Sequence, residues 1–207
     1  MSGTPASQTL FDLSGGHPAL DLVNSLDNRF RDDGPNENLV RYSDLLRFLR
    51  ESGLLDAQQI GLLNKPASME AAEQALHAVK ELREATAGVF YAVMEEKAPA
   101  TADVLTLERH FLEAGRHRQL RWDSDHAHMT WRWDRIEADP DFPVWLLAQS
   151  VSDLLLSDRA ARVRTCAVDT CRWLFLDTSK NHTRRWCNMK VCGNRMKARR
   201  FHARRDA

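Results

Sequence analysis

The residues with the clearest chemistry in this chain are its four cysteines, Cys166, Cys171, Cys187 and Cys192. They form two pairs of equal spacing, with four residues inside each pair and fifteen between the pairs. Thiolates in two such pairs can surround one Zn²⁺ tetrahedrally, and a shell of four protein ligands leaves no position for a reactive water. The spacing therefore predicts one structural zinc ion.

Two disulfides and four unconnected thiols are the alternatives to zinc. Disulfides are typical of exported chains, and the first residues show no basic start followed by an apolar run, so we expect a cytoplasmic protein. The cysteine segment holds few large apolar side chains, and metal binding can supply the folding free energy that such a segment lacks. We expect His182, between the pairs, to be a surface residue, since four thiolates already fill the shell.

The formal net charge of zero conceals a division along the chain. Residues 159–207 contain 14 Lys and Arg against three Asp, which gives a local net charge of +11. Residues 1–158 carry the compensating charge of −11. A cationic segment attracts polyanions, and this one contains every cysteine, so we predict that it binds nucleic acid.

A basic helix is predicted to start near Asn194, shortly after the last cysteine. Arginine can bind phosphates bidentately and can read guanine edges. The candidate nucleic-acid contacts are Arg184, Arg185, Asn194, Arg195, Lys197, Arg199, Arg200 and Arg204. For Asn194, capping a turn is the more usual role. We expect Ala198 and Phe201 to pack on the zinc core, together with Trp186, whose alternative role is to stack on a base.

The rest of the chain is predicted to form a mostly helical α+β domain with a small β-hairpin. Capping residues and breakers predict helices that begin at Pro18, Ser43, Asp56, Ser68, Thr101 and Asp141. Between residues 120 and 133, apolar residues alternate with polar ones on both sides of a polar turn, which predicts the hairpin. We therefore expect an α+β domain at 1–160 and a four-cysteine zinc finger, ending in a basic helix, at 161–207.

Arg83 is the unusual residue of the helix that begins at Ser68. It lies seven residues after Leu76 and seven before Phe90, on an otherwise apolar face. A buried arginine needs an acceptor, and Asp21 and Asn24 are plausible partners. An internal ion pair is the favoured interpretation, and a pocket of Asp21, Asn24 and Arg83 for a small anionic effector is the second.

Several motifs resemble a known family. Cys192-Gly193-Asn194-Arg195 is the signature of the CGNR zinc-finger family of bacterial proteins, and Arg184-Arg185-Trp186-Cys187 is similar to that family too. Residues 20–25 (LDLVNS) and 82–85 (LREA) resemble the ABATE domain that precedes this finger. The resemblance implies that the four cysteines are zinc ligands. It also implies that the protein is a DNA-binding transcription regulator, and some members are linked to stress responses.

We therefore expect a transcription regulator with an N-terminal sensor domain and a finger that prefers DNA to RNA. The alternatives are an RNA-binding protein, a zinc-stabilised nuclease and a finger that makes only protein contacts. The sequence has no glycine-rich phosphate loop, nucleophile elbow or His-Glu metalloenzyme pair, so we expect no enzyme.

Two further expectations concern partners. No apolar stretch approaches the ~20 residues of a membrane-spanning helix, so no membrane partner is expected. One finger rarely buries enough surface for tight specific binding. We therefore expect a homodimer or a second contact from the N-terminal domain.

Overall fold

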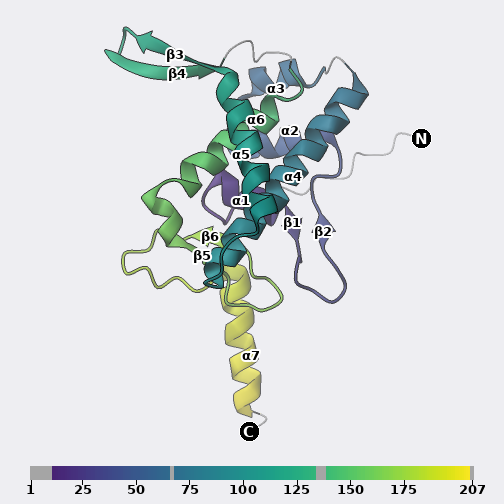
Figure 1. The fold of residues 1–207 in the computed structure, drawn as a ribbon. Helices are drawn as coiled ribbons and strands as arrows, with labels where there is room; N and C mark the ends of the chain where they lie inside the picture. The colour runs from purple at the N-terminus through teal and green to yellow at the C-terminus, as the bar shows by residue number, and fades with distance from the viewer. Residues whose placement is uncertain (1–10, 66–67, 134–138, 206–207) are drawn as a thin grey trace, which may run out of the picture.

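Helix α4 organises the fold of this computed structural model, which describes residues 11–65, 68–133 and 139–205. Helices α1, α2, α5 and α6 all pack against α4, and within the described ranges three separate two-stranded antiparallel sheets complete the α+β architecture (Figure 1). The helices are α1 Pro18–Asn24, α2 Tyr42–Glu51, α3 Ala57–Leu63, α4 Met69–Met94, α5 Thr101–Arg116, α6 Phe142–Leu155 and α7 Asn194–Arg205. The strands are β1 Leu26–Asp27, β2 Asn36–Glu37, β3 Arg118–Asp123, β4 His128–Trp133, β5 Val163–Thr165 and β6 Leu174–Leu176, and the short helical turns are η1 Asp158–Arg162 and η2 Met189–Gly193.

Helix starts follow the predicted capping chemistry at Asp56 and Ser68, whereas Asp141 precedes α6 without a capping hydrogen bond and α2 and α5 have other N-cap residues. Asp56 accepts a hydrogen bond from the backbone N–H of Gln59 (2.8 Å), and Ser68 caps α4 in the same way. Helix α2, however, has Arg41 at its N-cap rather than Ser43, because the Asp44 carboxylate reaches back to the Arg41 N–H (2.9 Å). Helix α5 has Ala100 at its N-cap instead of Thr101.

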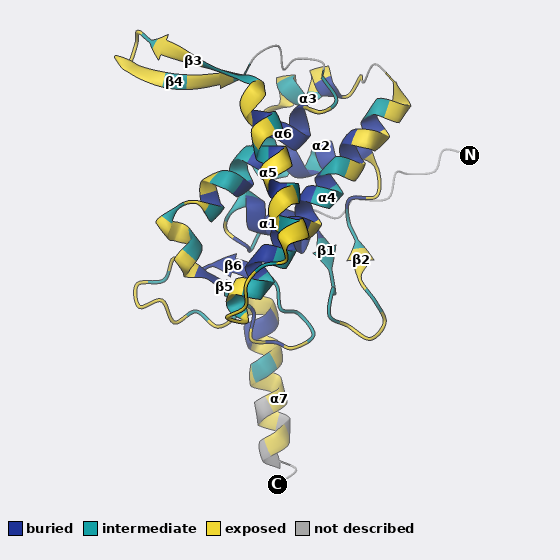
Figure 2. Ribbon diagram, in the orientation of Figure 1, coloured by how far each residue is buried: buried dark blue, intermediate teal, exposed yellow. Residues whose placement is uncertain are grey.

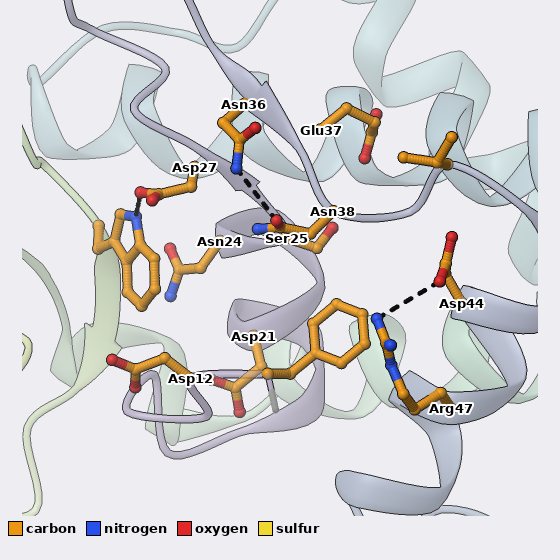
Figure 3. A pocket seen from close by; sticks show the side chains of 13 residues that line it. Asp12, Asp21, Asn24, Ser25, Asp27, Asn36, Glu37, Asn38, Asp44 and Arg47 are labelled. Atoms are coloured by element: carbon orange, nitrogen blue, oxygen red, sulfur yellow. Dashed lines mark hydrogen bonds and ion pairs between the residues drawn. The ribbon is translucent and has the colours of Figure 1, made fainter. Parts of the chain in front are cut away.

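Helix α1 is buried on every side, including the side that carries its polar residues (Figure 2). It lies between α4, α6 and β6, so Asp21 and Asn24 are covered by other parts of the chain instead of facing water. Both side chains also line a cavity beside the helix (Figure 3). The polar stripe of α1 is therefore a contact surface within the protein.

The predicted hairpin is present as β3 and β4, which extend away from the helices (Figure 1). Helix α5 turns only part of its apolar surface inward. Leu105 and Leu112 are exposed, and the helix buries Leu107, His110 and Ala114 instead.

Strand β6 belongs to two hydrophobic cores at once. Leu174 and Leu176 pack with Val163 into the large core of the helical domain. Phe175 points the other way and packs with the cysteines. Because successive side chains alternate across a strand, three residues are enough to join the two cores.

Within the described parts of the chain, no helix combines the length and the apolar character that crossing a membrane requires.

Candidate metal centre and nucleic-acid surface

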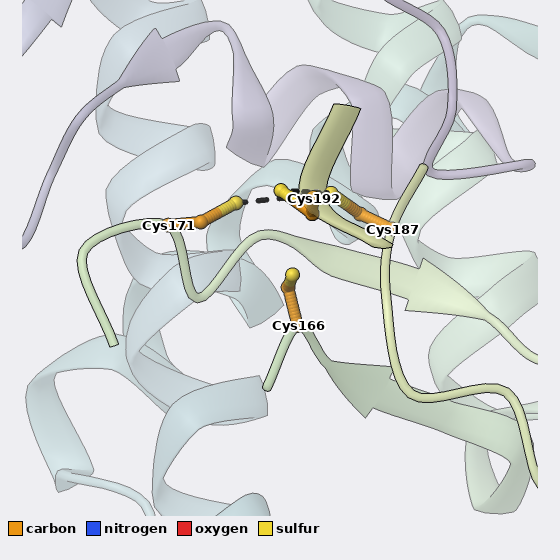
Figure 4. Close-up of side chains that lie close together, drawn as sticks. All are labelled: Cys166, Cys171, Cys187 and Cys192. Atoms are coloured by element: carbon orange, nitrogen blue, oxygen red, sulfur yellow. Dashed lines mark hydrogen bonds between the residues drawn. The ribbon is translucent and has the colours of Figure 1, made fainter. Parts of the chain in front are cut away.

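The four cysteines converge from two turns and one strand end (Figure 4). Cys166 follows β5, and its N–H donates to the carbonyl of Trp173 (2.8 Å). In the first turn, the Cys171 N–H donates to Val168 O (2.8 Å), and in the second, the Cys192 N–H donates to Asn188 O (2.9 Å). Each pair is thus held by its own backbone turn.

The distances between the sulfur atoms fit one tetrahedral metal ion. All four lie within 4.8 Å of one another, and Cys187 Sγ is 3.7 Å from the sulfurs of both Cys171 and Cys192. A Zn–S distance of ~2.3 Å gives a tetrahedral edge of ~3.8 Å, whereas a disulfide requires about 2.05 Å. The four side chains form no disulfides. The site therefore suits one structural zinc ion and excludes the disulfide alternative.

The thiols oppose one another's ionisation. Hydrogen bonding to Cys166, together with burial, raises the pKa of Cys171 and Cys187, and burial raises the pKa of Cys192. The pKa of Cys166 is lowered because it accepts hydrogen bonds from its neighbours. A divalent cation supplies the positive charge that allows all four to ionise together, since a coordinated thiol is deprotonated.

Arg184 is not available to a ligand, in contrast to its prediction as a nucleic-acid contact. Its guanidinium lies 4.4 Å from the centre of the Phe175 ring and donates to the carbonyls of Ser14 (3.1 Å), Trp186 (2.9 Å) and Cys187. The backbone N–H of Arg184 donates to the buried carboxylate of Asp177 (3.0 Å). Arg184 therefore builds the loop between the cysteine pairs.

Other predicted contacts lie at the surface. Arg185, Asn194, Arg195, Lys197 and Arg199 are exposed. The Asn194 amide donates to Lys190 O (3.0 Å), which is the capping role considered from the sequence. Arg200 and Arg204 belong to α7, but their side chains lie outside the part of the chain that the structure describes. Two other cations of the cysteine segment, Lys180 and Lys190, are exposed as well, and no pattern in the sequence marked them because each stands apart from other basic residues.

Helix α7 leaves the zinc core almost at once and extends away from the rest of the molecule (Figure 2). Ala198 is exposed and Phe201 is 58% exposed, so the expected packing of these two residues on the zinc core is wrong. Met196, one turn closer to Cys192, packs there instead, together with Trp186.

The partners of Arg83 differ from those expected. Arg83 is 3% exposed and donates two hydrogen bonds of 2.8 Å to Glu37 and one of 2.8 Å to Glu84. Although burial opposes ionisation of Glu37, the hydrogen bonds from Arg83 keep its pKa below the ordinary value. Arg83 therefore forms an internal ion pair, but Asp21 and Asn24 are not its acceptors.

Asp21 and Asn24 instead join the helical domain to the cysteine segment. The Asn24 amide donates to Leu174 O (2.8 Å) and accepts from Leu174 N–H (3.0 Å). Asp21 accepts from Gly15 N–H (2.8 Å), while Gly15 O accepts from Leu176 N–H (2.8 Å). The Asn24 side chain and the Gly15 backbone thus pair with the edge of β6 that faces away from β5, as a neighbouring strand would, and Asp21 holds Gly15 in place.

The structure thus bonds a helical domain to a four-cysteine module that suits one zinc ion and that continues into a basic helix. Residues 16–158 match the ABATE family model, described as "Putative stress-induced transcription regulator", and residues 162–205 match the CGNR zinc finger. The chain belongs to the ABATE family and carries a CGNR finger. No curated protein matches the sequence.

Proposed function

We propose that the protein is a DNA-binding transcription regulator whose finger contacts the duplex through α7 and the adjoining turn. The exposed cations of α7 carry this proposal. Arg195, Lys197 and Arg199 project from a helix that begins two residues after the zinc ligand Cys192. The metal thus fixes the base of a cationic rod, and multiple phosphate contacts give strong, salt-dependent binding.

The shape of α7 favours DNA over RNA. A helix is about 10–12 Å wide with its side chains, and the major groove of B-DNA is about 12 Å wide. The major groove of A-form RNA is too narrow for side chains to read. The negative charge of residues 1–158 keeps the helical domain away from the phosphates, so α7 is the part that approaches the duplex.

The test is a fluorescence-anisotropy titration of the zinc-loaded chain with duplex DNA, single-stranded DNA and structured RNA over a series of salt concentrations. The double variant Arg195→Gln/Arg199→Gln should lower the salt slope by about two, since each phosphate contact contributes ~0.9. The control Arg116→Gln/Arg132→Gln removes two arginines of the helical domain that are 73% and 67% exposed. Binding that is equally weak for all three polymers, or equal losses in both variants, would refute the proposal, and preference for RNA would establish the alternative.

We further propose that the protein binds without catalysis. Four thiolates complete the metal shell, so the zinc ion offers no position for a reactive water. A plasmid-nicking assay with Mg²⁺ tests this point, and cleavage that is lost in Arg195→Gln/Arg199→Gln would establish a nuclease instead. Reduced thiols suit a cytoplasmic protein, and we propose this location for the regulator. We also propose a role in stress responses and a homodimer that places two fingers on one DNA site.

The structure gives no support to an anionic effector at Arg83. Glu37 and Glu84 already balance the charge of this guanidinium, and Lys80 lies 3.8 Å from Glu37 as well. Ser25 occupies the remaining side of the guanidinium with a hydrogen bond of 3.3 Å. An effector that acts through the helical domain must therefore bind at a site other than Arg83.

A further inference from the structure

A cavity of about 520 Å³ lies where the helical domain meets the finger (Figure 3). Asp21 and Asn24 of α1 form one wall, Phe11 and Asp44 form another, and Trp173 of the finger closes the side next to β6. Small-molecule sites have volumes of roughly 300–1,000 Å³. An occupant of this cavity would touch both parts of the protein.

The lining of the cavity is negatively charged. Glu37 is balanced by Arg83, and Asp44 is paired with Arg47 at 3.4 Å. The remaining carboxylates are those of Asp12, Asp21 and Asp27. Across the parts of the chain that the structure describes, these three form no ion pair, so the cavity has an uncompensated charge of about −3 when they are ionised.

Asp21 is the most confined of the three, with 5% of its surface exposed. Its Oδ1 accepts from Gly15 N–H, and among the described residues its second oxygen has no hydrogen-bond partner. Burial raises the pKa of Asp21 to about 7, and the neighbouring Asp12 carboxylate adds to this effect. A buried carboxylate without a cation is unfavourable, which leaves a place for one from outside.

The carboxylates do not converge as metal ligands do. Of the described residues, only the four cysteines form a group placed to hold a metal ion. The space between the acids is instead flanked by the rings of Phe11 and Trp173, which can cover apolar carbon atoms. The Arg47 guanidinium already lies 4.9 Å from the centre of the Phe11 ring, so the Trp173 ring and the carboxylates are what attract a further positive charge. This arrangement suits an extended cation with a hydrocarbon body.

We infer that the cavity binds a small organic cation, an aliphatic amine or guanidine, with its charged group at Asp21 and its carbon chain against Phe11 and Trp173. The inference deepens the proposed function, because it assigns the effector of the regulator to a cationic class. Trp173 Nε1 donates to Asp27 (2.8 Å), and Asn24 holds Leu174, the next residue along the chain. The occupant therefore rests on the same side chains that hold the finger in place.

The test is isothermal titration calorimetry of the zinc-loaded full chain with putrescine, a four-carbon diamine, at pH 8 and without DNA. Saturable binding of one putrescine per chain is expected, with no binding of the neutral isostere 1,4-butanediol or of succinate. Asp21→Asn keeps the acceptor for Gly15 N–H and should weaken binding at least tenfold. Asp12→Asn, at the exposed rim, should weaken it less, and Asp125→Asn in the distant hairpin turn should not change it.

Circular dichroism and zinc content show whether the Asp21 and Asp12 variants are folded. The inference is overturned if neither putrescine nor agmatine binds the wild-type chain, if Asp125→Asn weakens binding as much as Asp21→Asn, or if Mg²⁺ at equal ionic strength displaces putrescine completely. Because the titration contains no DNA, its failure is distinct from a failure of the finger to bind DNA.

Discussion

The side chain of Asn24 pairs with both backbone groups of Leu174, 150 residues further along the chain. This two-bond contact extends the β5–β6 sheet by one polar side chain, so an amide takes the place of a third strand. It makes the attachment of the finger to the helical domain specific in direction and register.

Loss of this amide should be costly. In Asn24→Ala, the N–H and carbonyl of buried Leu174 lose their partners, and each unsatisfied group costs about 1–3 kcal/mol. Urea unfolding of the zinc-loaded protein should show a loss of about 2–5 kcal/mol in the free energy of unfolding. Asn36→Ala, at an exposed position of β2, is the control and should change stability by less than about 0.5 kcal/mol. Equal effects of the two variants would contradict this role for Asn24.

Gly15 should tolerate no side chain. A Cβ at this position would lie 2.6 Å from Asp21 Oδ1 and 3.1 Å from Asn24 Nδ2. Gly15→Ala should therefore shift the two residues that hold β6, at a cost of about 1–3 kcal/mol. In Gly61→Ala, where nothing lies within 4 Å of the added carbon, stability should rise by up to about 1 kcal/mol. Thermal unfolding of both variants checks this contrast, and a Gly15→Ala protein as stable as the wild type would disprove it.

Removal of zinc should destabilise more than the finger. Leu174 and Leu176 belong to the large core, so the collapse of the cysteine turns withdraws two buried side chains from the helical domain. Chelation, or Cys192→Ser, should lower the midpoint of unfolding measured on the helices by circular dichroism. Metal analysis should give one zinc per wild-type chain. A helical transition that is unchanged in the metal-free protein would show that the two cores are independent.

Asp21 should make stability fall as pH rises. Its pKa is about 7 in the folded protein against an ordinary value of 3.8, so the folded state binds more protons between these values than the unfolded state. The stabilising effect of protonated Asp21 is complete below about pH 4 and is lost by about pH 7, with a total on the order of 4 kcal/mol. Asp21→Asn should lack this contribution and be more stable than the wild type at pH 8. Denaturation across pH 4–8 measures the difference, for which Asp125→Asn should retain the wild-type slope.

The sequence was sufficient to predict the metal centre and most helix starts. Paired cysteines and capping residues act through contacts within a few positions along the chain, so their spacing carries the information. Asp56 and Ser68 illustrate this, since each caps its helix by bonding a backbone N–H three residues ahead.

The roles of several charged residues could not be predicted in this way. Arg184 and Arg185 are adjacent and chemically identical. The guanidinium of Arg184 donates hydrogen bonds to backbone carbonyls, however, whereas Arg185 is exposed. Likewise, Glu37 lies at the end of a polar loop, and no periodic pattern links it to Arg83, 46 residues away. Such partners depend on tertiary contacts that local spacing does not encode.

The two-sided packing of β6 also limits how the finger can be handled. A fragment of residues 162–205 would leave Leu174 and Leu176 bare, since their neighbours lie in the helical domain. This finger is therefore not an independent folding unit. To fold in another protein, it would need a surface that replaces the one α1 provides.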